Sequence, residues 1–159
     1  MNIAGYCAES ITEGDGMRAV VYISGCRHAC PGCHNAEAQD FAYGRPFTLA
    51  RQDAIIAEIA ANPLLDGITL CGGDPFFSAA ECAAFVRRFR ADCPDRTVWA
   101  YTGFTFDALI RRPDLRELAE LCDVIIDGRY IEAERDLTLK YRGSCNQRII
   151  DVKTRSVIA

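Results

Sequence analysis

The chain has 159 residues, half of them apolar, with a formal net charge of −4 and a calculated pI of about 5.2. This length predicts a single domain, residues 1–159, with a sizeable hydrophobic core. The acidic balance argues against a nucleic-acid-binding protein, and no apolar run approaches the roughly 20 residues that cross a bilayer.

Nine cysteines are a high and odd number for a chain of this size. The amino-terminal residues lack the basic and long apolar regions of an export signal, so we expect a cytoplasmic location. Thiols stay reduced in that compartment. The cysteines therefore favour a metal site over a framework of disulfides.

The first predicted strand covers residues 19–23, a continuous β-branched and aromatic run typical of a buried strand. The residues before it are mixed and contain the turn signal Gly14-Asp15-Gly16. Arg18 stands directly before the strand. We interpret it as a surface arginine, with a contact to a groove or a partner as the alternative.

Two helices with recognisable starts follow. The first is expected over residues 49–61 with Thr48 as its N-cap, and its inner face would consist of Ile55, Ile56, Ile59 and Ala60. A strand at residues 67–71 precedes the second helix, which begins with a capping box at residues 78–81. Its buried stripe would consist of Cys82, Phe85, Val86 and Phe89.

The second half repeats the alternation of strand and helix. Strands are predicted at residues 97–101 and 123–126, with helical turns at 105–110 and 114–121 between them. Residues 146–151 are a possible last strand, and the tail after Val152 is expected to be loosely held.

Strands and helices that alternate at this spacing predict an α/β fold with a mainly parallel sheet. Four or five such units are too few for a closed eight-stranded barrel, so we expect an open, partial βα barrel. The carboxyl ends of parallel strands meet at one edge, where such folds bind ligands. The segments that should converge there are residues 26–33, 72–74, 102–103 and 127–128.

The loop after the first strand carries the chemistry. Cys26, Cys30 and Cys33 form a C-x3-C-x2-C pattern, with a turn signal at Pro31-Gly32. Three thiolates around one centre suit zinc or an iron–sulfur cluster. His28 or His34 could complete a zinc site, whereas a four-iron cluster would keep one iron without a protein ligand. Unrelated structural cysteines are a third alternative.

The other loops at this edge offer weaker signals. Gly72-Gly73-Asp74 lets backbone groups and one carboxylate approach an amino-acid ligand, although a sharp strand-to-helix turn is the simpler reading. Thr102-Gly103 and Asp127-Gly128 are each either plain turns or ligand contacts; for Asp127 the contact would be to a ribose hydroxyl or a partner.

The remaining cysteines are mostly interpreted as small buried hydrophobic residues. Cys71 and Cys122 fall at strand positions and Cys82 on the inner face of a helix. Cys7 and Cys93 have no assigned role. Cys145 lies in a dense polar stretch that is either a solvated loop or a segment that reaches the groove or a partner.

The cysteine pattern at the end of a first strand resembles the signature of the radical S-adenosylmethionine enzymes. More narrowly, the chain is similar to the small activases of anaerobic ribonucleoside-triphosphate reductases, over nearly its whole length. The late Arg-Gly-Ser-x-Asn-Gln block and the short length point to this group. The resemblance also rests on residues 14–18, 23–26, 30–35, 72–75, 101–103, 127–128 and 142–147.

The resemblance implies both cofactors and their contacts. Cys26, Cys30 and Cys33 would hold a [4Fe–4S] cluster whose open iron binds S-adenosylmethionine. The methionine ammonium would lie against Gly72, Gly73 and Asp74, and the adenine side against Gly32, Cys33 and His34. Thr102 and Asp127 are further expected contacts of S-adenosylmethionine.

The resemblance also implies partners and a reaction. The activase cleaves S-adenosylmethionine reductively, and the resulting radical removes a hydrogen atom from a glycine of the large reductase subunit. A low-potential electron donor such as flavodoxin or ferredoxin and a homodimer are expected; nucleic acid and membrane are not. The alternatives are an activase of another glycyl-radical enzyme and a non-catalytic zinc or iron–sulfur interaction module.

Overall fold

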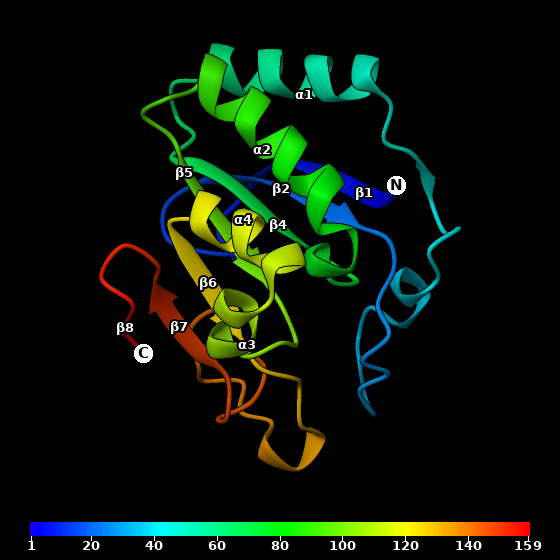
Figure 1. The fold of residues 1–159 in the computed structure, drawn as a ribbon, viewed down its shortest axis with the longest axis vertical. Helices are drawn as coiled ribbons and strands as arrows, with labels where there is room; N and C mark the ends of the chain where they lie inside the picture. Colours follow the sequence, from blue (N-terminus) through cyan, green and yellow to red (C-terminus); the bar gives the residue numbers. More distant parts are fainter.

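The computed structural model describes residues 1–159, which form one eight-stranded sheet and four α-helices (Figure 1). The strands are β1 (Asn2–Ser10), β2 (Arg18–Ile23), β3 (Arg45–Pro46), β4 (Gly67–Gly72), β5 (Thr97–Tyr101), β6 (Val124–Asp127), β7 (Arg148–Asp151) and β8 (Ser156–Val157). The α-helices are α1 (Leu49–Ala61), α2 (Ala79–Asp92), α3 (Phe106–Arg111) and α4 (Pro113–Leu121). Three 3-10 helices are η1 (Ala36–Gln39), η2 (Pro75–Ser78) and η3 (Glu132–Glu134).

The sheet is mixed, in the order β3-β1-β2-β4-β5-β6-β7-β8. The four central strands β2, β4, β5 and β6 are parallel, as the alternation with helices predicts. The four outer strands pair antiparallel. The expectation of a mainly parallel sheet is therefore right for the centre and incomplete at both sides. The partial barrel stays a prediction.

Two of the outer strands depart from the sequence analysis. The mixed amino-terminal segment forms the nine-residue strand β1, which pairs with β2. The expected loose tail after Val152 is wrong, because β8 pairs with β7 and the backbone of Ile149 bonds with that of Ile158 at 2.8 Å. Hairpin partners of this kind need no apolar run of their own, because the neighbouring strand supplies the hydrogen bonds.

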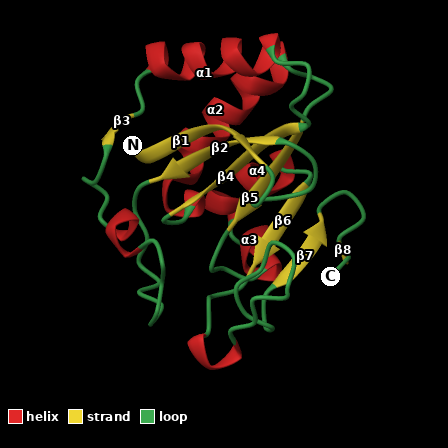
Figure 2. Cartoon of the chain, turned by 180° about the vertical axis from the view of Figure 1, so that it is seen from behind, coloured by secondary structure: helices red, strands yellow, loops and turns green.

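All four α-helices cover one face of the sheet, and the opposite face carries none (Figures 1 and 2). The main core of 29 buried residues lies between these two layers. The predicted stripes of α1 and α2 are buried there, except that Ala60 is exposed. Not one of these helices combines the length and the apolar character that a bilayer crossing demands.

The two predicted helix caps have different outcomes. Thr48 is confirmed as the N-cap of α1, since its side chain accepts a hydrogen bond from the backbone N–H of Arg51 at 3.2 Å. The capping box at the start of α2 is wrong. Ser78 ends η2 and makes no side-chain cap bond, and the carboxylate of Glu81 pairs with the amino terminus of Met1 instead.

Arg18 is buried, with 1% of its surface exposed, so the surface interpretation is wrong. All five of its N–H groups find acceptors. Nε donates to Thr69 Oγ1 at 2.8 Å, and the two terminal nitrogens donate to the Asp15 carbonyl, the Ile68 carbonyl, and the carbonyl and hydroxyl of Thr97. The guanidinium thereby joins the amino-terminal ends of β4 and β5.

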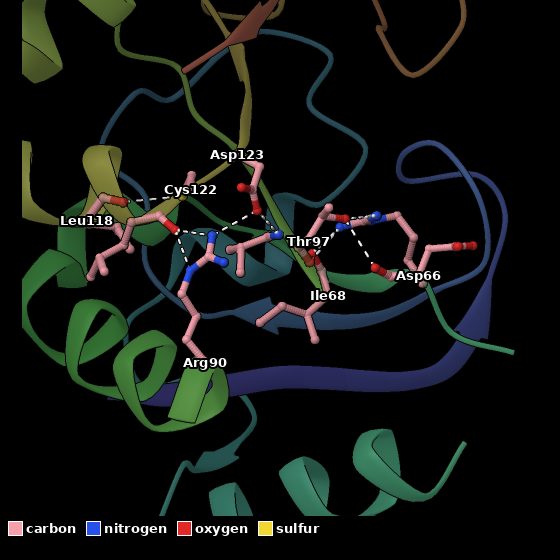
Figure 3. A network of polar contacts seen from close by, with 10 residues as sticks. Asp66, Ile68, Arg90, Thr97, Leu118, Cys122 and Asp123 are labelled. Carbon is pink, nitrogen blue, oxygen red and sulfur yellow. Dashed lines mark hydrogen bonds and ion pairs between the residues drawn. The ribbon is translucent and has the colours of Figure 1, made fainter. Parts of the chain in front are cut away.

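A second arginine joins helix and sheet nearby. Arg90 of α2 donates to the Leu121 carbonyl at 2.7 Å and to the Asp123 carboxylate at 2.8 Å. Figure 3 shows Arg90 pointing towards Asp123. The same carboxylate accepts from the backbone N–H of Val98 at 2.7 Å. The edge of the sheet opposite the cysteine loop is thus held by satisfied polar groups.

The cysteines outside the loop mostly behave as small apolar residues. Cys71, Cys82, Cys93 and Cys122 are buried, as predicted for three of them, although Cys122 follows α4 and lies outside the strand. Cys7 is half-buried in β1, and Cys145 is exposed. All nine thiols are free.

Candidate functional site

The cysteine loop leaves the end of β2 and is held at its start by η1. The backbone N–H groups of Gly25 and Cys26 donate to the carbonyls of Ala38 and Gln39 at 2.7 and 3.0 Å. Gly25 has φ +107°, and a Cβ there would lie 2.3 Å from the ring of Phe41. Only glycine fits this position, so the entry to the loop has one backbone path.

The three cysteines of the pattern are half-buried, with free thiols. The predicted turn is present, since Gly32 has φ +74° and the N–H of Cys33 donates to the Cys30 carbonyl at 3.2 Å. Burial raises the pKa of the Cys26 thiol to about 11.

The thiols suit an iron–sulfur cluster by their chemistry, because partly accessible thiols on one loop are the donors that such clusters use. No three histidine, cysteine, aspartate or glutamate side chains of the chain converge to hold a single metal ion. The three cysteines therefore fit an iron–sulfur cluster by the chemistry of their side chains and not by converged positions.

The glycine-rich turn after β4 lies directly beside this loop. The N–H of Gly73 donates to the Ile23 carbonyl at 2.7 Å, and that of Asp74 to the Gly25 carbonyl at 2.9 Å. A Cβ on Gly73 would lie 2.5 Å from the Ala38 carbonyl oxygen. The structure thus brings together the two loops that the parallel strands place at one edge.

The carboxylate of Asp74 connects three segments of the site: the cysteine loop, the loop after β5 and the start of η2. It is 1% exposed, and its Oδ2 accepts from Thr102 Oγ1 and the N–H of Gly103, both at 2.9 Å. Oδ2 also lies 2.8 Å from Nε2 of His28, and Oδ1 accepts from the N–H of Phe76 at 2.9 Å. Thr102 is therefore part of the site. A ligand ammonium at this carboxylate would have to replace one of the four donors.

Asp127 lies in a different set of contacts. Its carboxylate accepts from the N–H of Phe106 at the start of α3 at 2.7 Å, and from the Nε and Nη2 of Arg148 at 3.0 and 2.5 Å. It is 1% exposed. These contacts link β6, β7 and α3 through an ion pair whose carboxylate is buried and whose arginine is half-exposed. The predicted contact to a ribose stays a prediction.

A cavity of about 330 Å³ opens between the segment that follows the cysteine loop, residues 34–43, and the strands β1, β2 and β4; none of the three cysteines lines it. Two predicted contact residues, His34 and Gly72, lie in its wall, and Nδ2 of Asn35 donates to the Gly72 carbonyl at 3.3 Å. The volume falls within the range of small-molecule sites. The other lining residues are Ala4, Gly5, Tyr22, Ala36, Glu37, Ala38 and Tyr43.

Sequence reasoning missed several residues of this region. His28 was considered as a zinc ligand, but its Nε2 is engaged by Asp74. Tyr22 and Asn35 line the cavity without a motif that singles them out, and Arg148 pairs with Asp127. The only signal for Asn35 was its place inside the matched block that begins at Cys30.

Comparison with known proteins places the whole chain in one family. A family model described as a 4Fe-4S single cluster domain matches residues 12–150. A Pasteurella multocida (strain Pm70) protein is 36% identical over 152 residues, covering 94% of this chain and 96% of that protein. An Escherichia coli (strain K12) protein is 35% identical over 150 residues, covering 92% and 96%.

An Enterobacteria phage T4 protein is 34% identical over 143 residues, covering 86% of this chain and 85% of that protein. All three relatives bear the name anaerobic ribonucleoside-triphosphate reductase-activating protein. The range of the family model contains both the cysteine loop and the glycine-rich turn. The chain therefore belongs to the family of anaerobic ribonucleoside-triphosphate reductase-activating proteins and contains a 4Fe-4S single cluster domain.

Proposed function

We propose that the chain generates the glycyl radical of an anaerobic ribonucleoside-triphosphate reductase, using a [4Fe–4S] cluster and S-adenosylmethionine. One observation carries the proposal. The three-thiol loop and the glycine-rich turn are hydrogen-bonded side by side, because the N–H of Asp74 donates to the Gly25 carbonyl one residue before Cys26. A cluster and an amino-acid cosubstrate held on these two segments would be neighbours.

Cys26, Cys30 and Cys33 would hold the cluster through their thiolates. A reduced cluster held there would supply the one electron needed for reductive cleavage of S-adenosylmethionine to methionine and a 5′-deoxyadenosyl radical. That radical would abstract a hydrogen atom from a glycine of the reductase. The protein would contribute position, because the two segments proposed to hold the cofactors are hydrogen-bonded to each other at the carboxyl ends of β2 and β4.

The proposed cosubstrate contacts lie on the two loops and on the cavity beside them, whose wall contains His34 and Gly72. Gly72, Gly73 and Asp74 would receive the methionine end, with the backbone close because neither glycine carries a Cβ. Residues 32–34 would line the adenine side. The cavity of about 330 Å³ supports this assignment, since both His34 and Gly72 lie in its wall.

Thr102 and Asp127 are the outer contacts of the proposed cosubstrate site. Thr102 supports the methionine end through its bond to Asp74 at 2.9 Å. Asp127 would contact the ribose of the cosubstrate from the end of β6, where its carboxylate pairs with Arg148 of β7. Its carboxylate is buried, so any contact to a ribose requires a shift of that ion pair.

The proposed partners are the large reductase subunit and a low-potential electron donor such as flavodoxin or ferredoxin. The names of the relatives support the reductase as the target. A homodimer and a cytoplasmic location complete the proposal, and the half-buried, free thiols fit a reducing compartment.

Electron paramagnetic resonance of the anaerobically reconstituted, reduced protein tests the proposal. S-adenosylmethionine should change the cluster signal, and dithionite should then yield 5′-deoxyadenosine. Cys30→Ala should abolish both results, because it removes one thiolate of the loop. Cys145→Ala is the matched control, since that cysteine is exposed and lies outside the loop. A signal indifferent to S-adenosylmethionine contradicts the proposal and favours an interaction module.

The target needs a second measurement. Incubation of the activated protein with the large reductase subunit should produce the doublet of a glycyl radical. The same incubation with pyruvate formate-lyase should give none. A radical on the lyase alone would assign the chain to another glycyl-radical enzyme.

A further inference from the structure

We propose that His28 is a positioning residue that fastens the cysteine loop to Asp74 and so holds the cluster cysteines in register with the cosubstrate turn. The inference rests on the proposed function. It assigns a role to a side chain that is neither a ligand of the cluster nor a contact of the cosubstrate. Three observations carry it.

The first observation is that His28 provides the only hydrogen bond to leave this stretch. Within residues 27–33, every other hydrogen bond stays inside the loop: the N–H of His28 to Cys26 Sγ at 3.5 Å, and the N–H of Cys33 to the Cys30 carbonyl. Nε2 of His28 alone reaches the body of the protein, at Asp74 Oδ2. Since a carboxylate accepts, Nε2 carries the proton.

The second observation is that the imidazole of His28 is buried between neighbouring side chains. Its side chain is 5% exposed, and its ring packs edge-on against Phe77 and Phe104 with centroids 5.1 and 4.7 Å apart. A Cβ on Gly103 would lie 2.4 Å from Cδ2 of His28. The neighbouring loop residues Arg27 and Ala29 are exposed. His28 is therefore the one side chain of this stretch that is both enclosed and hydrogen-bonded to the body of the protein, while Arg27 lies over the ring of Phe41 at 5.3 Å.

The third observation concerns the acceptor. Asp74 is itself held by Thr102, Gly103 and Phe76, which come from the ends of β5 and the start of η2. The carboxylate is thus a fixed point of the sheet edge, and it belongs to the turn proposed to receive the cosubstrate. A bond from His28 to this point sets the distance between the two halves of the site.

His28 stands two residues from Cys26 and two from Cys30. Loss of its bond would free the stretch that carries these thiols while Asp74 keeps its three other donors. The expected defect is a cluster that leaves the protein more easily and responds more weakly to the cosubstrate, in a chain that is still folded.

Three variants separate the bond from the packing. His28→Phe keeps a ring between Phe77 and Phe104 and removes the donor. His28→Gln keeps an N–H donor of similar reach. Arg27→Ala removes the exposed neighbour, which makes no side-chain hydrogen bond and only a cation–π contact with Phe41, and serves as the matched control. If His28→Phe does not fold, His28→Ala removes the same bond without a ring. Thermal unfolding of the cluster-free chains establishes that each variant is folded.

The readout is the rate at which a ferrous chelator removes iron from the reconstituted proteins under anaerobic conditions. We expect His28→Phe to lose iron about 10-fold faster than the unchanged protein, by analogy with other outer contacts of metal sites. His28→Gln and Arg27→Ala should stay close to the unchanged rate. The concentration of S-adenosylmethionine that half-converts the paramagnetic signal should rise in His28→Phe and be restored in His28→Gln.

The outcomes distinguish this inference from the proposed function. If the unchanged protein holds a cluster but ignores S-adenosylmethionine, the proposed function fails and the chelator rates still test the anchor. If folded His28→Phe loses iron no faster than Arg27→Ala, the anchor is overturned. If His28→Gln loses iron as fast as His28→Phe, the hydrogen bond is not what holds the loop, and the inference is likewise overturned.

Discussion

Arg18 is the first residue of β2, and its guanidinium lies 5.2 Å from the ring centre of Trp99 in β5. Burial lowers its pKa to about 10, and its five N–H groups donate to five acceptors, several of them buried or part-buried. Arg18→Met should lower the free energy of unfolding by about 2–4 kcal/mol, because those acceptors lose their donors. Urea denaturation of the cluster-free chain measures the change.

Arg87→Met is the matched control for Arg18. Arg87 is half-exposed and pairs only with Glu117 across the surface. Such pairs contribute less than about 1 kcal/mol, so the two arginines should differ clearly. Equal losses in the two variants would contradict the structural role of Arg18.

At the residue scale, the sequence predicts apolar burial but not the partners of buried polar side chains. The buried stripe of α2 was predictable, because apolar side chains at helical spacing lie on one face of the helix and that face packs against the core. The surroundings of Arg18, His28 and Asp74 were not, because most of their side-chain partners lie between 28 and 79 residues away along the chain. A polar residue's role depends on such partners, and no local pattern encodes them.

Among the elements, the two helix starts make a matched pair for mutation. Thr48→Ala should lower the free energy of unfolding by about 1 kcal/mol, since the Thr48 hydroxyl caps α1. Ser78→Ala should change it by less than about 0.5 kcal/mol, since Ser78 makes no cap bond. Urea denaturation of both variants checks the pair, and a larger effect at Ser78 would contradict the cap assignments.

The helices and strands also differ in how well the sequence predicts them. The four parallel strands and α1 were predictable from apolar runs bounded by glycine, proline or a cap. The strands β1 and β8 were not, because their pairing with β2 and β7 supplies the order that their own residues lack. Whether such outer segments form strands depends on the strands that they pair with.

At the scale of the whole molecule, the buried thiols predict a loss of stability in alkali. Burial raises the pKa of Cys122 to about 12 and that of Cys82 further above its usual range. Both thiols ionise near pH 9 once unfolded, so the unfolded chain releases protons that the folded protein keeps. Stability is therefore full below pH 9 and falls as pH rises towards 12, by about 1.4 kcal/mol per pH unit for each thiol.

Urea denaturation at pH 7.5, 9 and 10.5 in anaerobic, reducing buffer measures this slope. Cys82→Ala should make the slope shallower. Cys145→Ala should leave it unchanged, because that cysteine is exposed in the folded protein. An equal slope in all three proteins would assign the alkaline loss to groups other than the buried thiols.

The residues alone predict the three candidate cluster cysteines, which stay a prediction, and the parallel pairing of the central strands, which the structure confirms. The spacing of Cys26, Cys30 and Cys33 is a local property, and three thiols within eight residues carry their chemistry wherever the loop lies. The tertiary structure alone decided what surrounds them. It placed Asp74 against His28 and Thr102, and Asp127 against Arg148, because hydrogen bonds between segments distant in the chain form only once the strand ends meet at one edge.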